Sequence, residues 1–224
     1  MELYVDSANL KEIRHAASMG IISGVTTNPS LLAKEDPNQD IKTLLLDIHA
    51  SVGGHLSVEV VSTDTAGMLR EAEEILKWAP EATIKIPMIA DGLAAVKELN
   101  RQDIPTNVTL IFSATQALAA ANAGATYVSV FLGRLDDIGA DGVQVVRDVA
   151  EIWDMNDLDA LIIAASIRHP IHVMECAKAG AHISTVPYKV LMQCIKHPLT
   201  DSGLQAFLND YNKMQSEKEK LGTK

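Results

Sequence analysis

Short runs of β-type residues alternate along the chain with segments of helical period, and this alternation restricts the fold more than any other feature. Such a pattern is typical of parallel strands joined by crossover helices. Eight of these runs can be counted, so we expect eight strand-helix units. The predicted strands lie approximately at residues 3–6, 24–27, 56–61, 83–86, 106–111, 126–131, 161–166 and 182–186.

Eight parallel strands with eight crossovers close most economically into a barrel, so the predicted fold class is α/β, a (β/α)8 TIM barrel. A chain of 224 residues with 47% hydrophobic content can bury one core of that size. We therefore expect one barrel domain over residues 1–224. An additional C-terminal helix is expected at about 201–216, followed by a frayed, charged tail at 217–224.

Composition argues against two classes of partner. The formal net charge is −10 and no basic stripe offsets it, so a nucleic-acid partner is not expected. Residues 104–133 carry no charge and are numerous enough to span a bilayer. Pro105, Asn107 and Gly124 interrupt this stretch, however, and it fits a buried strand, a helix and a second buried strand better. No membrane partner is therefore expected.

The cysteines and histidines give no sign of a metal site. Cys176 and Cys194 are the only cysteines and lack CxxC spacing, which fits a reducing compartment. The seven histidines show no ligand spacing; His169 and His172 flank Pro170 and fit a helix start better. The N-terminal residues run directly into a predicted strand, which leaves no room for a signal or transit peptide. We expect a cytoplasmic protein without a structural metal site.

Lys85 stands alone in the apolar run at 83–87. With period-two alternation, Ile84 and Ile86 share one face of this strand, while Lys85 shares the other with Thr83; in a barrel, that second face looks inward. Burial disfavours the charged form of an amine, and a neutral amine can attack a carbonyl to form a Schiff base. The alternative is a core lysine held by a carboxylate.

Polar residues recur where the predicted strands end, the place where (β/α)8 barrels build their active sites. The residue pairs Asn107 with Thr109 and Ser129 with Phe131 are spaced by two and therefore share a face. For Thr26 or Ser166 taken alone, ordinary polarity beside a loop is the better explanation. The full set is Asp6, Thr26, Asn28, Glu59, Lys85, Asn107, Thr109, Ser129, Phe131, Ser166 and Arg168.

This set contains the groups that imine chemistry needs. Glu59, in the strand before that of the lysine, can carry protons through carbinolamine formation and dehydration. Thr109, in the next strand, can hold a relaying water. Asp6 can take the proton of a substrate hydroxyl as a carbon-carbon bond breaks. The neutral amides of Asn28 and Asn107 can bind sugar hydroxyls.

Two arginines follow the sixth and seventh strands. Arg134 and Arg168, together with the Ser166 hydroxyl, match the geometry of a phosphate group if they converge on one mouth. The alternative is a surface ion pair, for which Asp136 and Asp137 stand beside Arg134.

Seven motifs at these strand ends carry a family resemblance. They are YVDSAN at 4–9, GVTTNPS at 24–30, VEV at 58–60, IKIP at 84–87, TNVTL at 106–110, FLGRLDD at 131–137 and ASIR at 165–168. Over essentially its whole length the chain resembles the small, single-barrel transaldolases of the class I aldolase type, and several of these motifs together are highly specific.

The resemblance implies a role for each group of residues. Lys85 would form the Schiff base, Glu59 and Thr109 would handle water and protons, and Asp6 would assist carbon-carbon bond cleavage. Three residues would hold the dihydroxyacetone unit: Asn28, Asn107 and Ser129. Three others would bind phosphate: Arg134, Ser166 and Arg168. Thr26 and Phe131 complete the set of substrate-binding candidates.

The reaction implied moves a dihydroxyacetone unit from sedoheptulose 7-phosphate to glyceraldehyde 3-phosphate, giving erythrose 4-phosphate and fructose 6-phosphate in the pentose phosphate pathway. The partners implied are these sugar phosphates and further copies of the chain, in a homo-oligomer of five or ten subunits whose terminal helix reaches a neighbour. The resemblance implies no metal or organic cofactor.

Two alternatives stay open. Fructose 6-phosphate aldolases share the barrel and the lysine, but their pattern has glutamine and tyrosine where this chain has Glu59 and Phe131. These two residues, with Asn107, Ser129 and Arg168, favour transfer over simple cleavage. A more distant alternative is a sugar-phosphate-binding barrel without covalent chemistry, which would need the arginines but not the lysine.

Overall fold

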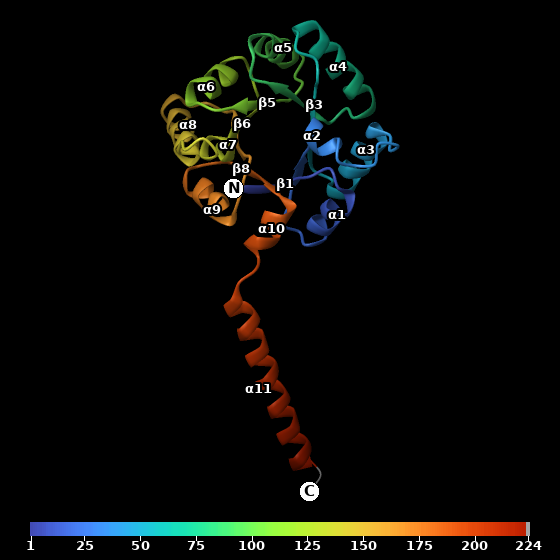
Figure 1. Ribbon diagram of the computed structural model, residues 1–224, viewed down its shortest axis with the longest axis vertical. Helices are drawn as coiled ribbons and strands as arrows, with labels where there is room; N and C mark the ends of the chain where they lie inside the picture. Colours follow the sequence, from blue (N-terminus) through green and yellow to red (C-terminus); the bar gives the residue numbers. More distant parts are fainter. Residues whose placement is uncertain (223–224) are drawn as a thin grey trace. The chain divides into compact units, whose positions relative to one another are not determined.

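The computed structural model describes residues 1–222, and it confirms the predicted (β/α)8 barrel (Figure 1). Eight parallel strands pair in sequence order, and β8 closes the barrel against β1. The strands are β1 (Glu2–Asp6), β2 (Gly24–Thr26), β3 (His55–Glu59), β4 (Thr83–Pro87), β5 (Thr106–Ile111), β6 (Tyr127–Phe131), β7 (Leu161–Ala165) and β8 (Ile183–Pro187).

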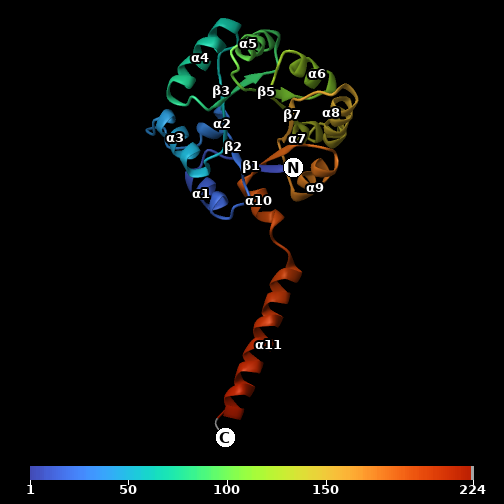
Figure 2. The same cartoon turned by 180° about the vertical axis from the view of Figure 1, so that it is seen from behind.

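Helices surround the strands, as both Figure 1 and the view from behind in Figure 2 show. Side chains of Asn9, Asp40, Asp64, Ser113 and Asp141 accept hydrogen bonds from the first free backbone N–H groups of five of these helices. Around the barrel lie α1 (Leu10–Ser18), α2 (Pro29–Leu32), α3 (Ile41–Val52), α4 (Thr65–Trp78), α5 (Ala90–Asn100), α6 (Ala114–Asn122), α7 (Leu132–Asp136), α8 (Gly142–Asn156), α9 (Pro170–Lys178) and α10 (Tyr188–Cys194).

Each predicted strand end lies within two residues of the observed one. The uncharged stretch at 104–133 forms β5, α6 and β6, as the strand-helix-strand interpretation requires. Among the helices of residues 1–222, none combines the length and the apolar character that crossing a bilayer demands.

The C-terminal helix α11 (Pro198–Gly222) is longer than predicted at both ends. The expectation of a frayed tail at 217–224 is wrong for residues 217–222, which are helical. Residues 223–224 lie outside the described part of the chain. The error has a physical reason, because the run Glu217-Lys218-Glu219-Lys220 consists of strong helix formers, and proline is tolerated in a first turn.

The chain divides into two compact units, Met1–Leu191 and Met192–Lys224, so one domain over 1–224 stays a prediction. The first unit contains the whole barrel. The second carries α11, on which large apolar side chains recur every three or four residues and are exposed. This apolar face of α11 consists of Leu204, Phe207, Leu208, Tyr211 and Met214.

Aromatic rings close the N-terminal end of the barrel interior. The Tyr4 ring stacks on His55 at a centroid distance of 4.8 Å, and Tyr127 meets the His55 ring edge-on, also at 4.8 Å. Ile163 and Ile183 pack against Tyr4. We call these five residues the barrel floor. The backbone of β2 approaches closely here, since a Cβ on Gly24 would lie 2.8 Å from the Tyr4 ring.

Above the floor the interior becomes polar, and its side chains bond between strands that are not neighbours. Asn107 on β5 donates to the Ser57 hydroxyl on β3, at 3.1 Å, and the hydroxyls of Thr26 on β2 and Thr185 on β8 lie 2.6 Å apart. Such bonds can form only inside the barrel. The aliphatic residues of alternate parity, such as Ile84 and Ile86, are fully buried on the other face of the strands.

The floor generates a prediction about acid stability. Burial lowers the pKa of His55 to about 4, from an ordinary value of 6.5. As the pH falls from 6.5 to 4, the unfolded chain therefore takes up a proton that the folded protein refuses, and unfolding is favoured. Between these limits the native protein should lose up to about 3 kcal/mol more stability than the variant His55→Phe, which keeps the ring stack.

Urea unfolding of both proteins at a series of pH values across this range measures the difference. Carboxylates that titrate nearby affect both proteins alike, so the comparison isolates the imidazole. Parallel stability curves for the two proteins would contradict the prediction.

Candidate active site

Lys85 lies inside the C-terminal end of the barrel with two partners for its amine. Nζ lies 3.0 Å from Oε2 of Glu59 and donates to the backbone carbonyl of Thr27 at 3.0 Å. The register places Glu59 directly beside Lys85 on adjacent strands. Their side chains are 5% and 15% exposed, so the pair is held away from bulk water. A carboxylate thus holds the lysine, as in the alternative of a core lysine paired with a carboxylate. The pair, however, lies at the wall of an open cavity.

That cavity has a volume of about 500 Å³ and lies at the C-terminal ends of the strands. It is lined by residues from all eight strands and from the segments that follow β2, β6 and β7. Ten of the twelve residues predicted for the site line it: Asp6, Thr26, Asn28, Glu59, Lys85, Ser129, Phe131, Arg134, Ser166 and Arg168. Their positions are those of one site, while their individual roles stay predictions.

Asp6 brings a second carboxyl group to this cavity from β1. Burial raises the pKa of Asp6 above its usual range, against the nearby Lys85 charge and a hydrogen bond from Thr26, which both lower it. Thr26 Oγ1 donates to Asp6 Oδ1 at 3.0 Å. Since Thr26 has only one hydroxyl proton, Thr185 must be the donor in the bond between the two threonines. A carboxylate with a raised pKa is a better proton acceptor than an exposed one.

Asn107 and Thr109 do not line the cavity, contrary to the expectation that they share a face at the mouth. The pairing of β5 with β6 shifts between Val108 and Ile111, and Leu110 adopts a positive φ of 61° there. This irregularity turns Leu110 toward the cavity and leaves Thr109 buried, with a hydroxyl that has no hydrogen-bond partner. A bulge breaks the period-two rule on which the expectation rested.

Asn107 lies beneath the cavity and reaches it through another residue. Its Oδ1 accepts from the hydroxyl of Ser129 at 2.7 Å, and Ser129 lines the cavity. Asn28 does line the cavity, but its Oδ1 already accepts from the backbone N–H of Leu31 at the start of α2. The NH2 group of Asn28 is therefore what it can offer to a ligand.

Both arginines reach the cavity, in different settings. Arg168 pairs with Asp137 at 2.7 Å, so the ion-pair alternative applies to Arg168 rather than to Arg134. The Arg134 guanidinium lies 5.2 Å from the centre of the Phe131 ring. Two guanidinium groups beside the Ser166 hydroxyl make this side of the cavity suitable for an anion.

The backbone around Ser166 depends on a glycine. Ser166 has a positive φ of 63°, and a Cβ on Gly133 would lie only 1.9 Å from its carbonyl oxygen. The absence of a side chain at Gly133 thus lets α7, which carries Arg134, lie directly against the segment that carries Ser166 and Arg168.

Nine lining residues escaped the sequence analysis, among them Lys34, Leu110 and Thr185. The parity of β8 could have predicted Thr185. It lies two residues before Pro187, which also lines the cavity, so the two side chains share the inward face of the strand. Leu110 gave no signal, since nothing in an aliphatic run marks a bulge. Lys34 follows α2, in a segment whose approach to the barrel mouth is tertiary.

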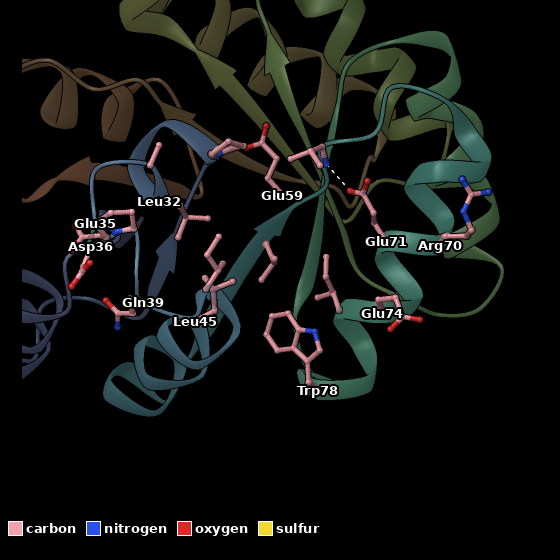
Figure 3. A pocket seen from close by; sticks show the side chains of 17 residues that line it. Leu32, Glu35, Asp36, Gln39, Leu45, Glu59, Arg70, Glu71, Glu74 and Trp78 are labelled. Carbon is pink, nitrogen blue, oxygen red and sulfur yellow. Dashed lines mark hydrogen bonds between the residues drawn. The ribbon is translucent and has the colours of Figure 1, made fainter.

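A larger cavity, of about 780 Å³, lies outside the barrel beside α3 and α4 (Figure 3). Leu45 and Trp78 give it apolar walls, and Glu59 is the one predicted site residue that borders it. Glu71, also in its lining, accepts hydrogen bonds from the backbone of Val61 and from Ser62. Because it lacks Lys85, Asp6, Arg134 and Arg168, this cavity is a poor candidate for covalent chemistry.

No group of three or more histidine, cysteine, aspartate or glutamate side chains within residues 1–222 is arranged to hold a metal ion. The expectation of metal-free chemistry stays a prediction. The polar groups of the 500 Å³ cavity are two amines, two carboxyls, hydroxyls, one amide and two guanidiniums. These suit a ligand that carries a carbonyl, hydroxyls and an anionic group.

Fold and cavity together define a class of protein: a (β/α)8-barrel enzyme whose site lies at the C-terminal ends of its strands. The profile of the family described as Transaldolase/Fructose-6-phosphate aldolase matches residues 3–224. The chain therefore belongs to the transaldolase/fructose-6-phosphate aldolase family, as its motifs indicate, and it is an enzyme of transaldolase type.

Several relatives cover nearly the whole chain. Proteins named probable transaldolase from Geobacillus kaustophilus and Thermoanaerobacter are each 56% identical, over 96% and 95% of this chain and over 100% and 98% of their own lengths. A probable transaldolase from Clostridium botulinum is 55% identical over 96% of this chain and 99% of its own length.

The hydrogen bonds of Asp6 generate a prediction. The variant Thr26→Val removes the bond that stabilises the charged carboxylate, so the pKa of Asp6 should rise further. If Asp6 acts as a base, the acid limb of the kcat/KM profile moves to higher pH by about one unit, because a hydrogen bond to a charged group contributes roughly 1.5 kcal/mol.

Thr185→Val is the matched control. It removes a hydroxyl from the same network while Thr26 keeps its proton directed at Asp6. The acid limb of this variant should stay close to that of the native enzyme. Equal shifts in the two variants would show that the Thr26 bond does not tune Asp6.

Proposed function

We propose that the enzyme is a transaldolase that carries a dihydroxyacetone unit as a Schiff base on Lys85, from sedoheptulose 7-phosphate to glyceraldehyde 3-phosphate. One observation carries the proposal: a buried amine lies 3.0 Å from a carboxylate, in a cavity that two arginines border. The products are erythrose 4-phosphate and fructose 6-phosphate, and the place of the reaction is the pentose phosphate pathway.

Glu59 is the acid and base for imine formation in this proposal. An ammonium group cannot attack a carbonyl, so Lys85 must first give up a proton, and the Glu59 carboxylate lies within hydrogen-bond distance to accept it. The amine then adds to the ketone carbon of the donor. The same carboxyl group returns a proton to the carbinolamine hydroxyl, which leaves as water. Thr109 is proposed to hold that water with its unpartnered hydroxyl.

Asp6 is the base for breaking the carbon-carbon bond. It takes the proton of the hydroxyl on the departing carbon of the bond that breaks; that oxygen becomes the aldehyde oxygen, and the electrons of the broken bond move into the protonated imine. An aldehyde leaves, and a three-carbon enamine stays attached to Lys85. The acceptor aldehyde then adds to the enamine, Asp6 returns the proton to its oxygen, and hydrolysis of the new imine frees the product.

Binding is assigned to the remaining lining residues. Arg134 and Arg168 with Ser166 take the phosphate group, because guanidinium groups bind oxyanions through paired hydrogen bonds. Asn28 and Ser129, the latter held by Asn107, bind hydroxyls of the dihydroxyacetone unit, and Thr26 completes this wall. Phe131 provides an apolar surface under Arg134. No cofactor enters any step.

A homo-oligomer of five or ten subunits is proposed on resemblance, and the apolar face of α11 supports it. Phe207 is 74% exposed and Leu204 59% exposed, a costly arrangement for a helix in water unless another surface covers it. Cytoplasmic localisation likewise remains a proposal from resemblance and composition.

Borohydride trapping tests whether Lys85 forms an imine. Borohydride added together with fructose 6-phosphate should inactivate the enzyme and attach a three- or six-carbon unit to Lys85, because reduction traps an imine permanently. Peptide mass spectrometry locates the added mass. Glu59→Gln should reduce kcat by roughly 100- to 10,000-fold, the usual contribution of a general acid or base.

Lys85→Met is the control, since it cannot form an imine and should gain no mass. If the native enzyme bound sugar phosphate but kept its activity and gained no mass in borohydride, the result would instead support a barrel that binds without covalent chemistry.

An assay with and without an acceptor aldehyde separates transfer from cleavage. Glyceraldehyde 3-phosphate should be released from fructose 6-phosphate only when erythrose 4-phosphate is present as acceptor. Phe131→Tyr should raise release without the acceptor, because a phenol hydroxyl at this wall can protonate the enamine or activate water, which phenylalanine cannot do.

Phe112→Tyr is the matched control, because the Phe112 ring packs edge-on against Phe131 at 5.9 Å yet does not line the cavity. It should leave the ratio of cleavage to transfer unchanged. Release by the native enzyme that is equal with and without acceptor would identify an aldolase and make the interpretation of Glu59 and Phe131 wrong.

A further inference from the structure

We infer that His55 and Ser57 are positioning residues for the donor ketose: they fix, through Asn107, the direction in which the Ser129 hydroxyl meets a donor hydroxyl beside the reacting carbonyl. The inference rests on the proposed function, because it names one donor-binding contact and what orients it. Neither residue lines the cavity.

A continuous chain of hydrogen bonds joins the barrel floor to the cavity. His55 Nε2 lies 2.7 Å from Ser57 Oγ, Asn107 Nδ2 donates to the same oxygen at 3.1 Å, and Ser129 Oγ donates to Asn107 Oδ1 at 2.7 Å. Ser57, Asn107 and Ser129 are almost fully buried. The four residues come from β3, β5 and β6, so the chain crosses the interior of the barrel.

The chemistry of the groups gives the chain one direction. Ser57 Oγ accepts from the amide of Asn107, and the other partner that the structure shows for this hydroxyl is Nε2 of His55, which takes the Ser57 proton in the tautomer that carries its own proton on Nδ1. The amide oxygen of Asn107 is then fixed toward Ser129, whose proton it takes. Ser129 is left with lone pairs for the cavity and acts there as an acceptor from a donor hydroxyl.

The floor keeps His55 in the state that this direction requires. Its ring contacts those of both Tyr4 and Tyr127, and burial lowers the pKa of His55 to about 4. The imidazole is therefore neutral near pH 7, and Nε2 can accept. Without this acceptor, the Ser57 hydroxyl can turn toward Asn107, the amide can reverse, and Ser129 loses its fixed direction.

A double-mutant cycle tests the inference. His55→Phe keeps an aromatic ring between the two tyrosines but removes the acceptor, whereas His55→Gln places an amide oxygen near the position of Nε2. The donors are fructose 6-phosphate and its 1-deoxy and 3-deoxy forms, which lack one or the other hydroxyl beside the carbonyl. For each enzyme kcat/KM is measured with each donor.

His55→Phe should lower kcat/KM for fructose 6-phosphate about tenfold, the effect of one net hydrogen bond, and should spare one of the two deoxy donors. His55→Gln should restore most of the loss. In a Ser129→Ala background, His55→Phe should have no further effect, because the hydroxyl that it orients is gone. Ser57→Ala should behave as His55→Phe does.

An equal loss with all three donors, or additive losses in the double variant, would mean that His55 only supports the fold and would overturn the inference. So would an unchanged kcat/KM in His55→Phe. Failure of the proposed function looks different: the native enzyme would yield no borohydride-trapped Lys85 with any donor.

Discussion

The site depends on the burial of one amine beside one carboxylate. Lys85 and Glu59 lie on adjacent strands in register, and within residues 1–222 the amine has one other hydrogen-bond partner, the Thr27 carbonyl just beyond β2. Because leaving either charge alone in this place costs several kcal/mol, each residue constrains the other. Only a barrel interior offers a setting that is dry enough to alter the chemistry of the amine and still open at one end to a substrate.

The interior meets these demands in layers. Aromatic and aliphatic side chains seal the floor, while the layer above it contains hydroxyls and an amide that bond to one another across the barrel, such as Ser57, Asn107 and Ser129. A polar layer of this kind is costly unless it is fully bonded, and bonding also removes its freedom to rotate. The floor thus affects the mouth, although no floor residue lines the cavity.

Sequence periodicity predicted the strands, the closed barrel and ten lining residues, because inward parity repeats every second residue and active sites lie at strand ends. It failed where the period breaks or where tertiary contacts decide. The bulge at Leu110 displaces Thr109 from the cavity. Thr185 on β8 lines the cavity but lies in none of the seven motifs. The hydrogen-bond chain from His55 was equally hidden, since a histidine at a strand start looks like ordinary surface polarity until Tyr4 and Tyr127 enclose it.

Transfer makes a stricter demand on this cavity than cleavage does. Under the proposed function the three-carbon enamine must survive on Lys85 until a second aldehyde arrives, so no group beside it should deliver a proton to carbon. The walls that complete the cavity around the polar groups include Leu110, Phe131, Ala165 and Ile167, none of which carries an acidic hydrogen on its side chain. The Arg134 guanidinium over the Phe131 ring leaves that face of the ring covered by a cation that stays charged and is a poor proton donor. The same guanidinium can bind the phosphate of the departing and of the arriving aldehyde, so one group can serve both halves of the exchange.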